Sequence, residues 1–304
     1  MIRGSERRPM TPRDIRLPLW LALRPSIAGG DGVNACRAPR EVAMRFIEGF
    51  LAVALAVAPV CGANAQDSMR GLDMSSPDMT MAEMTRAQVQ AVLAAAPGGH
   101  GADLSGKRLA GLDLSGLDLS GANLRAARLN HANLAHAKLD GATLDQAWAL
   151  DVDLTGASLV SASLFATQLA GAHLDGANLM GARVTADLTG ASLVGAQFEN
   201  ADCSADEKNQ SMGLMRATFK SADLRRANFS RANLARADLR FAKLSGANLS
   251  GASLREADAS GADLRGADLQ GADTSGLNLD SARIDGASAP LLVKAANLDR
   301  AYRE

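Results

Sequence analysis

The chain has 304 residues, of which 47% are apolar and 21% charged, and its formal net charge is −1 at pH 7. This balance is typical of a soluble globular protein and points to no particular class of partner. Aromatic residues make up only 3% of the chain, which excludes a core built mainly from large rings, so other side chains must fill the interior.

Residues 44–65 have the pattern of a secretory signal peptide. A charged start is followed by the apolar run FLAVALAVAPV and then by small residues that end at Ala65. The pattern predicts cleavage between Ala65 and Gln66, and hence a periplasmic or secreted protein. The apolar run is too short to form a stable transmembrane helix.

Residues 1–43 precede this signal and are rich in arginine without hydrophobic periodicity. Because a signal peptide normally starts a chain, we interpret residues 1–43 as a non-native or disordered extension and Met44 as a candidate translation start. Cys36 and Cys61 would be removed with these segments. Cys203 would then remain alone, so the mature chain can form no internal disulfide.

Residues 66–84 form a polar segment that contains five methionines: Met69, Met74, Met79, Met81 and Met84. Their thioethers are soft ligands suited to Cu(I), so a periplasmic copper-binding site is one hypothesis. The alternative, which we prefer, is a Met-rich linker that leads into the next element and holds no metal.

Residues 85–101 predict a short α-helix. Thr85 and Gln88 have the spacing of a capping box, in which each side chain bonds the other residue's backbone N–H. Val89, Val92 and Leu93 follow on one helical face. We expect this face to cover the exposed beginning of the next domain as an N-terminal capping helix.

From residue 102 to about 286 a leucine recurs at every fifth position, as in GLDLSGLDLSGANL at 111–124. This interval makes no stripe on an α-helix and alternates faces on a flat strand, so the chain must turn every five residues. Most units have leucine at their centre and alanine two residues before it, and many have Gly or Ser in their last two places. If leucine and alanine both point inward, one large and one small group per unit can fill a narrow core.

These A(D/N)LXX units resemble the pentapeptide repeat family over residues 102–286. The resemblance implies an all-β fold, a right-handed quadrilateral β-helix with four units in each 20-residue coil. Residues 20 apart should then stack, and a set of charges alternates in sign at this interval: Asp223, Lys243, Asp263 and Arg283. Each exposed pair adds only about 0–1 kcal/mol, but the alternation favours the 20-residue register.

The five-residue spacing breaks twice. One residue is missing after Val184, and six are added between Cys203 and Leu214. The second break predicts a polar loop at 206–211, which is either a binding loop or a tolerated insertion. After the repeats, residues 287–304 predict a C-terminal cap.

No residue set predicts catalysis. The segment GADLSGK, Gly101 to Lys107, approaches the spacing of a phosphate-binding loop, but Arg108 stands where Ser or Thr is required. Cys203 lies at a unit centre and should be buried and unreactive. The histidines lack metal-ligand spacing and a carboxylate partner in a cleft: His100, His131, His136 and His173. We therefore expect a non-catalytic protein with no cofactor and no small-molecule substrate.

A basic segment is the candidate interaction surface, and it contains five arginines: Arg225, Arg226, Arg231, Arg236 and Arg240. Three of them would lie on consecutive walls and form a belt. The belt is either solvated and locally paired, for example between Arg236 and Glu256, or it binds an anionic partner. Because residues 255–285 are mainly acidic, an end-to-end homodimer is a further hypothesis.

We interpret the chain as an exported, non-catalytic scaffold or protein-interaction module whose protein partner is unknown. The resemblance implies one alternative, since some pentapeptide repeat proteins mimic DNA and protect DNA gyrase from quinolones. The nearly balanced charge of residues 102–304 and the predicted export argue against that role, and also against nucleic acid as a partner.

Overall fold

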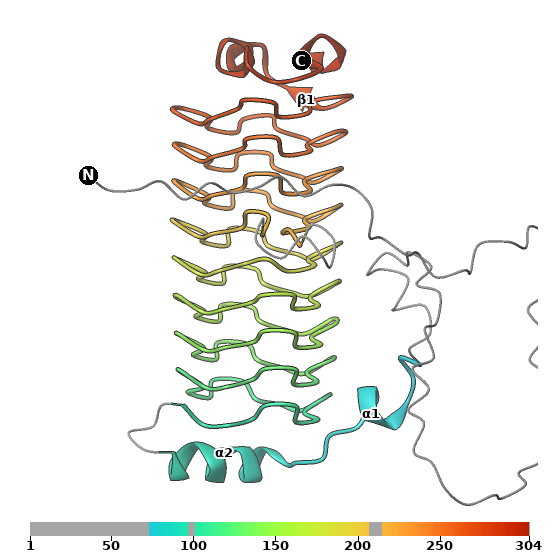
Figure 1. Ribbon diagram of the computed structural model, residues 1–304, viewed down its shortest axis with the longest axis vertical. Coiled ribbons are helices and arrows are strands. Elements are labelled where there is room, and N and C mark those ends of the chain that lie inside the picture. Colours follow the sequence, from blue (N-terminus) through green and yellow to red (C-terminus); the bar gives the residue numbers. More distant parts are fainter. Residues whose placement is uncertain (1–72, 97–100, 207–214, 304) are drawn as a thin grey trace, which may run out of the picture. The chain divides into compact units, whose positions relative to one another are not determined.

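The computed structural model describes residues 73–96, 101–206 and 215–303, all within one compact unit that spans Pro59–Glu304. In this unit, stacked coils of short bridges and turns form a parallel β-helix (Figure 1). The second unit, Met1–Ala58, lies outside the described residues. So do the predicted extension, signal peptide and cleavage site, with Ala65 and Gln66.

Each five-residue unit places two side chains in the core. Ala122 and Leu124, for example, are both 0% exposed, which confirms the inward positions of alanine and leucine. The residue between them, Asn123, donates its backbone N–H to Ala102 O at 2.9 Å, and Leu124 donates to Thr143 O at 2.7 Å. Backbone hydrogen bonds thus join each unit to the coils on both sides.

The last two residues of each unit turn the chain by a corner. In the unit centred on Leu124, Ala127 N donates to Leu124 O at 3.0 Å and closes the turn. The third residue of this turn, Ala126, has φ of 54°. A positive φ at this place is the geometry of a type II turn, and it explains why glycine is so common there.

Four units make one coil, because the residue that precedes a unit's centre forms a bridge with the residue 20 positions later. The predicted column is confirmed: Asp223 bridges Lys243, Lys243 bridges Asp263, and Asp263 bridges Arg283. Large inward side chains are few, but Phe198 and Phe229 stack on each other at 4.5 Å between ring centroids. Phe219 meets both rings edge-on.

The structure corrects the size of the second break. Asp187 bridges Thr218, an interval of 31, so the coil holds eleven residues more than a regular one. Among the described residues, the repeat resumes at the unit that contains Thr218, and Leu214, where it was predicted to resume, lies outside them. Asp206 N donates to Met215 O at 2.7 Å, and these two residues form an antiparallel bridge. Residues 207–214, with most of the predicted 206–211 loop, lie outside the described residues.

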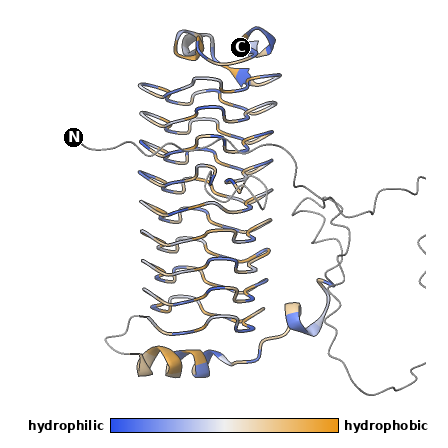
Figure 2. Cartoon of the chain, viewed as in Figure 1, coloured by the Kyte–Doolittle hydropathy of each residue, from blue (hydrophilic) through white to orange (hydrophobic). Residues whose placement is uncertain are grey.

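Two helices precede the coils, α1 (Pro77–Thr80) and α2 (Arg86–Ala95). The capping box predicted at the start of α2 is present: Gln88 N donates to the Thr85 hydroxyl, and Thr85 N donates to the Gln88 side chain. Val89 is 0% exposed and belongs to the same apolar cluster as the coils. In Figure 1, α2 lies across the end of the stack, and Figure 2 colours it mostly hydrophobic.

At the other end, β1 (Arg283–Ile284) pairs in parallel with β2 (Tyr302–Arg303). Between them lie two 3-10 helices, η4 (Gly286–Leu292) and η5 (Leu298–Arg300). Leu292 is fully buried, and the hydroxyl of Thr274 donates to Leu291 O at 3.1 Å. These contacts join η4 to the last coils. Within the described ranges, no helix is both long and apolar enough for a membrane span.

Candidate interaction surface

Large side chains occupy four consecutive corners of the coils near the insertion. Arg226, Arg231 and Arg236 take the third place of their turns with φ of 58°, 57° and 61°, and Phe241 follows with 59°. We call these four residues the corner girdle. Phe241 is 58% exposed and was not predicted as a surface residue, although a phenylalanine at a place where glycine and serine predominate is a signal that the sequence contains.

Three girdle side chains lie against glycines of the next coil. A Cβ at Gly261 would lie 2.5 Å from Phe241 Cδ1, so the phenylalanine ring extends over this glycine of the next coil. Arg226 and Arg231 extend similarly over Gly246 and Gly251, where a Cβ would lie 3.6 and 3.5 Å from the arginine Cγ atoms. Three girdle side chains therefore lean on corners that carry no side chain of their own.

The girdle arginines differ in their ion pairs. Arg231 pairs with Glu199, and Arg236 pairs with Glu256 at 2.8 Å, as predicted. Arg226 has no polar partner for its side chain among the residues that the structure describes. Arg226 is therefore the girdle cation that an incoming carboxylate can bind without displacing an internal partner.

The other two predicted arginines are held by aspartates of their own units. Arg225 Nη2 lies 2.8 Å from Asp223 Oδ2, and its hydrogen bonds hold the pKa of Asp223 below its ordinary value. Arg240 pairs in the same way with Asp238. Arg225 and Arg240 therefore form ion pairs within their own units, and we do not include them in the girdle.

Asp238 is the most buried carboxylate of this region, with a side chain that is 3% exposed. Burial by itself raises its pKa, but hydrogen bonds from Arg240 and the charges of Arg240 and Arg216 outweigh burial and lower the pKa overall. Asp238 thus stays ionised, and its loss would take a carboxylate from Arg216 and leave Arg240 only the more distant Asp258, at 3.8 Å.

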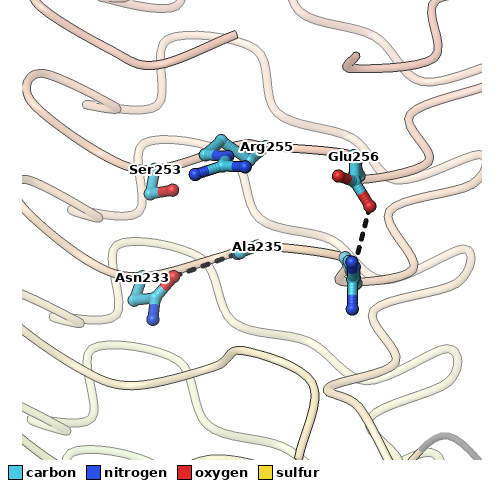
Figure 3. Close-up of a pocket in the computed structure, with 6 residues that line it drawn as sticks. Asn233, Ala235, Ser253, Arg255 and Glu256 are labelled. Atoms are coloured by element: carbon cyan, nitrogen blue, oxygen red, sulfur yellow. Dashed lines mark hydrogen bonds and ion pairs between the residues drawn. The ribbon is translucent and has the colours of Figure 1, made fainter. Parts of the chain in front are cut away.

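A surface hollow lies beside the girdle (Figure 3) and is lined by Asn233, Ala235, Arg236, Ser253, Arg255 and Glu256. Four of its polar side chains already have partners: Asn233, Arg236, Arg255 and Glu256. Asn233 Oδ1 accepts from Ala235 N at 3.2 Å, and Arg255 Nε lies 3.9 Å from an oxygen of Asp273. The lining suits a polar protein contact and contains no nucleophile with an adjacent base.

Three of the four histidines lie within the described residues, and His100 does not. His131 Nδ1 lies 3.8 Å from Asp151 Oδ2, a carboxylate partner that sequence spacing did not predict, because the two residues stack 20 apart at one corner. Both side chains are more than half exposed. His136 covers Gly156 at a neighbouring corner, and His173 lies on a wall. Within the described ranges no group of three His, Cys, Asp or Glu side chains could hold a metal ion.

The methionines of the predicted copper site have different environments. Met79 is 6% exposed and Met84 packs against the core, whereas Met81 is 61% exposed. Met74 is also exposed, and Met69 lies outside the described residues. The Cu(I) hypothesis remains a prediction, with at least two of its thioethers engaged in packing.

The structure also bears on the reactivity of Cys203 and on the segment that approaches the spacing of a phosphate-binding loop. Cys203 is fully buried, and burial raises the pKa of its thiol far above the ordinary value. The segment from Gly101 to Lys107 forms a wall and a corner of the first coil, with no helix after it. A phosphate-binding loop needs that helix, so this segment is part of the repeat.

Comparisons with known proteins agree on the repeat. The family model "Pentapeptide repeats" matches in eight copies, over residues 100–130, 108–146, 150–185, 162–202, 214–251 and 247–286. These ranges include more than half of the chain. Among curated proteins, no match was found.

Solved structures of similar proteins include HetL, a pentapeptide repeat protein involved in heterocyst differentiation regulation from the cyanobacterium Nostoc sp. strain PCC 7120. It is 30% identical, the match covers 73% of this chain and 95% of HetL, and the TM-score is 0.42. QnrB1, a plasmid-mediated fluoroquinolone resistance protein, is 16% identical over 62% of this chain and 90% of QnrB1, with a TM-score of 0.47.

Proposed function

Because the chain belongs to the pentapeptide repeat family, we propose that it is a non-catalytic, exported scaffold that binds a protein partner through the corner girdle. Proteins of this family are generally non-catalytic and mediate protein interactions. The right-handed quadrilateral β-helix supplies a stiff column, and function then depends on the side chains that this column displays.

The observation that carries the proposal is the girdle itself. An exposed aromatic ring and three arginines occupy consecutive corners of one coil, and these are the residue types enriched at protein interfaces. Arg226 has no polar side-chain partner among the described residues, so the complementary surface should carry carboxylates. The partner we propose is an acidic protein surface with an apolar residue for Phe241.

The proposal includes a structural role for α2. Its buried Val89 belongs to the cluster that fills the coils, and Arg86 donates to Asp113 O and Ser115 O, both at 2.8 Å. We propose that α2 caps the first coil and protects its open edge from pairing with another chain.

The girdle is tested by affinity capture from the organism's extract with the chain and two variants. R226E combined with F241A should abolish capture of any specific partner, because it reverses the free cation and removes the ring. R125E combined with V293A is the matched control, since it makes the same change of charge and removes an exposed apolar side chain at sites outside the girdle. Equal loss in both variants would mean that the girdle is not the binding surface.

The exported location is tested by cell fractionation with sequencing of the mature amino terminus. A periplasmic chain that begins at Gln66 is the expected result. An intact cytoplasmic chain would contradict export and make the gyrase alternative the better hypothesis, to be examined by a supercoiling assay.

A further inference from the structure

Residues 73–84, expected to be a linker, contact the first coils. Met79 in α1 is 6% exposed, and its carbonyl accepts a hydrogen bond from Asn130 Nδ2 at 3.1 Å. Asn130 is itself 3% exposed, and its Oδ1 accepts from Leu150 N at 3.0 Å. The amide of Asn130 therefore joins residues 73–84 to two successive coils.

Contact with residues 73–84 buries the corner at Ala110 and Asn130. Ala110 and Asn130 hold the first place after a unit centre, and they are only 5% and 3% exposed. The same place is exposed at Ser105 and Arg125, on the neighbouring corner of the same two coils. Burial at this corner is thus local, and Met79 is buried at the same contact.

Charge complementarity accompanies this contact. Residues 73–84 contain Asp73, Asp78 and Glu83 and no basic residue. Asp78 lies 2.6 Å from Arg108, and Glu83 lies 3.3 Å from Lys107. Glu83 N also donates to Arg108 O at 2.9 Å, so the segment adds a backbone hydrogen bond to the coil.

The surface beneath is basic beyond what the segment neutralises. Arg108 bridges Arg128 on the next coil, which places two like charges side by side. Arg128 has no polar side-chain partner among the described residues, and Trp148 follows it in the same column. We call Lys107, Arg108, Arg128 and Asn130 the basic corner.

We propose that the basic corner is a docking site for an acidic peptide segment of a partner protein, and that residues 73–84 occupy it in cis until such a segment displaces them. Residues 73–84 show which groups a ligand of this corner needs. These are two carboxylates five residues apart, an apolar side chain after the first, and a backbone N–H that can donate to the coil. Exposed ion pairs are individually weak, so the cis segment can exchange. This site is separate from the girdle and does not depend on its proposed role.

The test uses the full chain with D78K and E83K, which reverses both carboxylates and should release residues 73–84. A fluorescent peptide of sequence DMSSPDMTMAEM, residues 73–84, should bind this variant saturably. Binding to the unsubstituted chain should be weaker by about tenfold or more, because a tethered segment competes at an effective concentration on the order of millimolar. A scrambled peptide of equal charge is the control and should bind poorly to both.

Two further measurements make the result decisive. Limited proteolysis within residues 73–84 should be faster in the D78K/E83K variant, and Cys203 should stay protected from thiol reagents, which shows that the coils remain folded. Peptide binding should disappear with R108E and R128E added, or in about 1 M salt, where screening extends to about 3 Å. No binding to a variant whose segment is released, equal binding of the scrambled peptide, or a segment that stays protected despite charge reversal would each overturn the proposal.

Discussion

At the residue scale, the corners follow a rule that depends on the left-handed turn. Where a corner carries a large side chain, the residue 20 positions later is usually glycine, as at Phe241 and Gly261. Where both positions carry long side chains, they have opposite charges, as in Arg236 with Glu256. Side chains at this place lean towards the next coil, so that coil must offer either space or an ion-pair partner.

This rule predicts that G261A is more destabilising than G271A. Both glycines have φ of 68°, so alanine costs about 1–2 kcal/mol at either position. At Gly261 a Cβ would also meet the Phe241 ring, whereas at Gly271 the nearest atoms lie at 3.9 Å. Overpacking of this kind adds about 1–3 kcal/mol.

Denaturant unfolding of G261A, F241A and the double variant measures the coupling. F241A should recover most of the additional loss, with a coupling energy of about 0.5–3 kcal/mol. Additive effects would show that the ring moves away freely and that the corner rule has no energetic basis.

At the element scale, α2 is fixed by its capping box and its buried face, and T85A tests the first of these. Removing an N-cap hydroxyl costs about 0.5–2 kcal/mol. Because a solenoid's units contact only their neighbours, the loss should stay local. Hydrogen exchange should accelerate in α2 and the first coil while amides around Leu234 remain protected.

The matched control for T85A is Q90A, at an exposed position of the same helix. Alanine is the better helix former, so Q90A should leave exchange in α2 unchanged or slower. Uniform acceleration along the whole chain in T85A would contradict the local role of the cap.

The elements themselves could be predicted from sequence because each rests on a local requirement of the backbone. A five-residue period demands a corner, a left-handed corner favours glycine, and a Thr85 to Gln88 spacing closes a capping box. The seating of Met79 could not be predicted, since it joins residues 51 positions apart without periodicity. The predicted size of the insertion was wrong because Leu214 fits the five-residue period of the units that follow it. The bridge between Asp206 and Met215 joins residues nine apart without periodicity, so the sequence did not reveal it.

At the scale of the whole molecule, ion pairs within units matter more than the predicted columns. Asp223 lies 2.8 Å from Arg225 but 3.9 Å from Lys243, its neighbour in the column. Asp263 pairs likewise with Arg265 at 2.8 Å. The sequence contains this signal as the repeated motif DLR. The prediction favoured pairs between coils because the charges alternate in sign every 20 residues. Pairs between residues two apart depend on side-chain rotamers, which sequence spacing does not reveal.

These pairs predict how stability depends on pH. Hydrogen bonds from Arg265 are the largest influence on Asp263 and lower its pKa to about 2, below the unfolded value of about 3.9. A carboxyl with a depressed pKa stabilises the folded state above its unfolded pKa and loses that contribution as pH falls. With allowance for solvent screening of this partly exposed pair, Asp263 should contribute about 1–2 kcal/mol at neutral pH, most of which is lost between about pH 4 and pH 2.

The measurement is urea unfolding of the chain and of D263N at pH 7, 4, 3 and 2. D263N should be less stable at pH 7, and the difference should become small at pH 2, where the native carboxyl is about half protonated. Asp299 has no polar side-chain partner among the described residues, so D299N should follow the unsubstituted chain at every pH. A D263N difference that stays constant with pH would show that its effect is one of packing, and the in-unit pairs would then not explain the acid sensitivity of the coils.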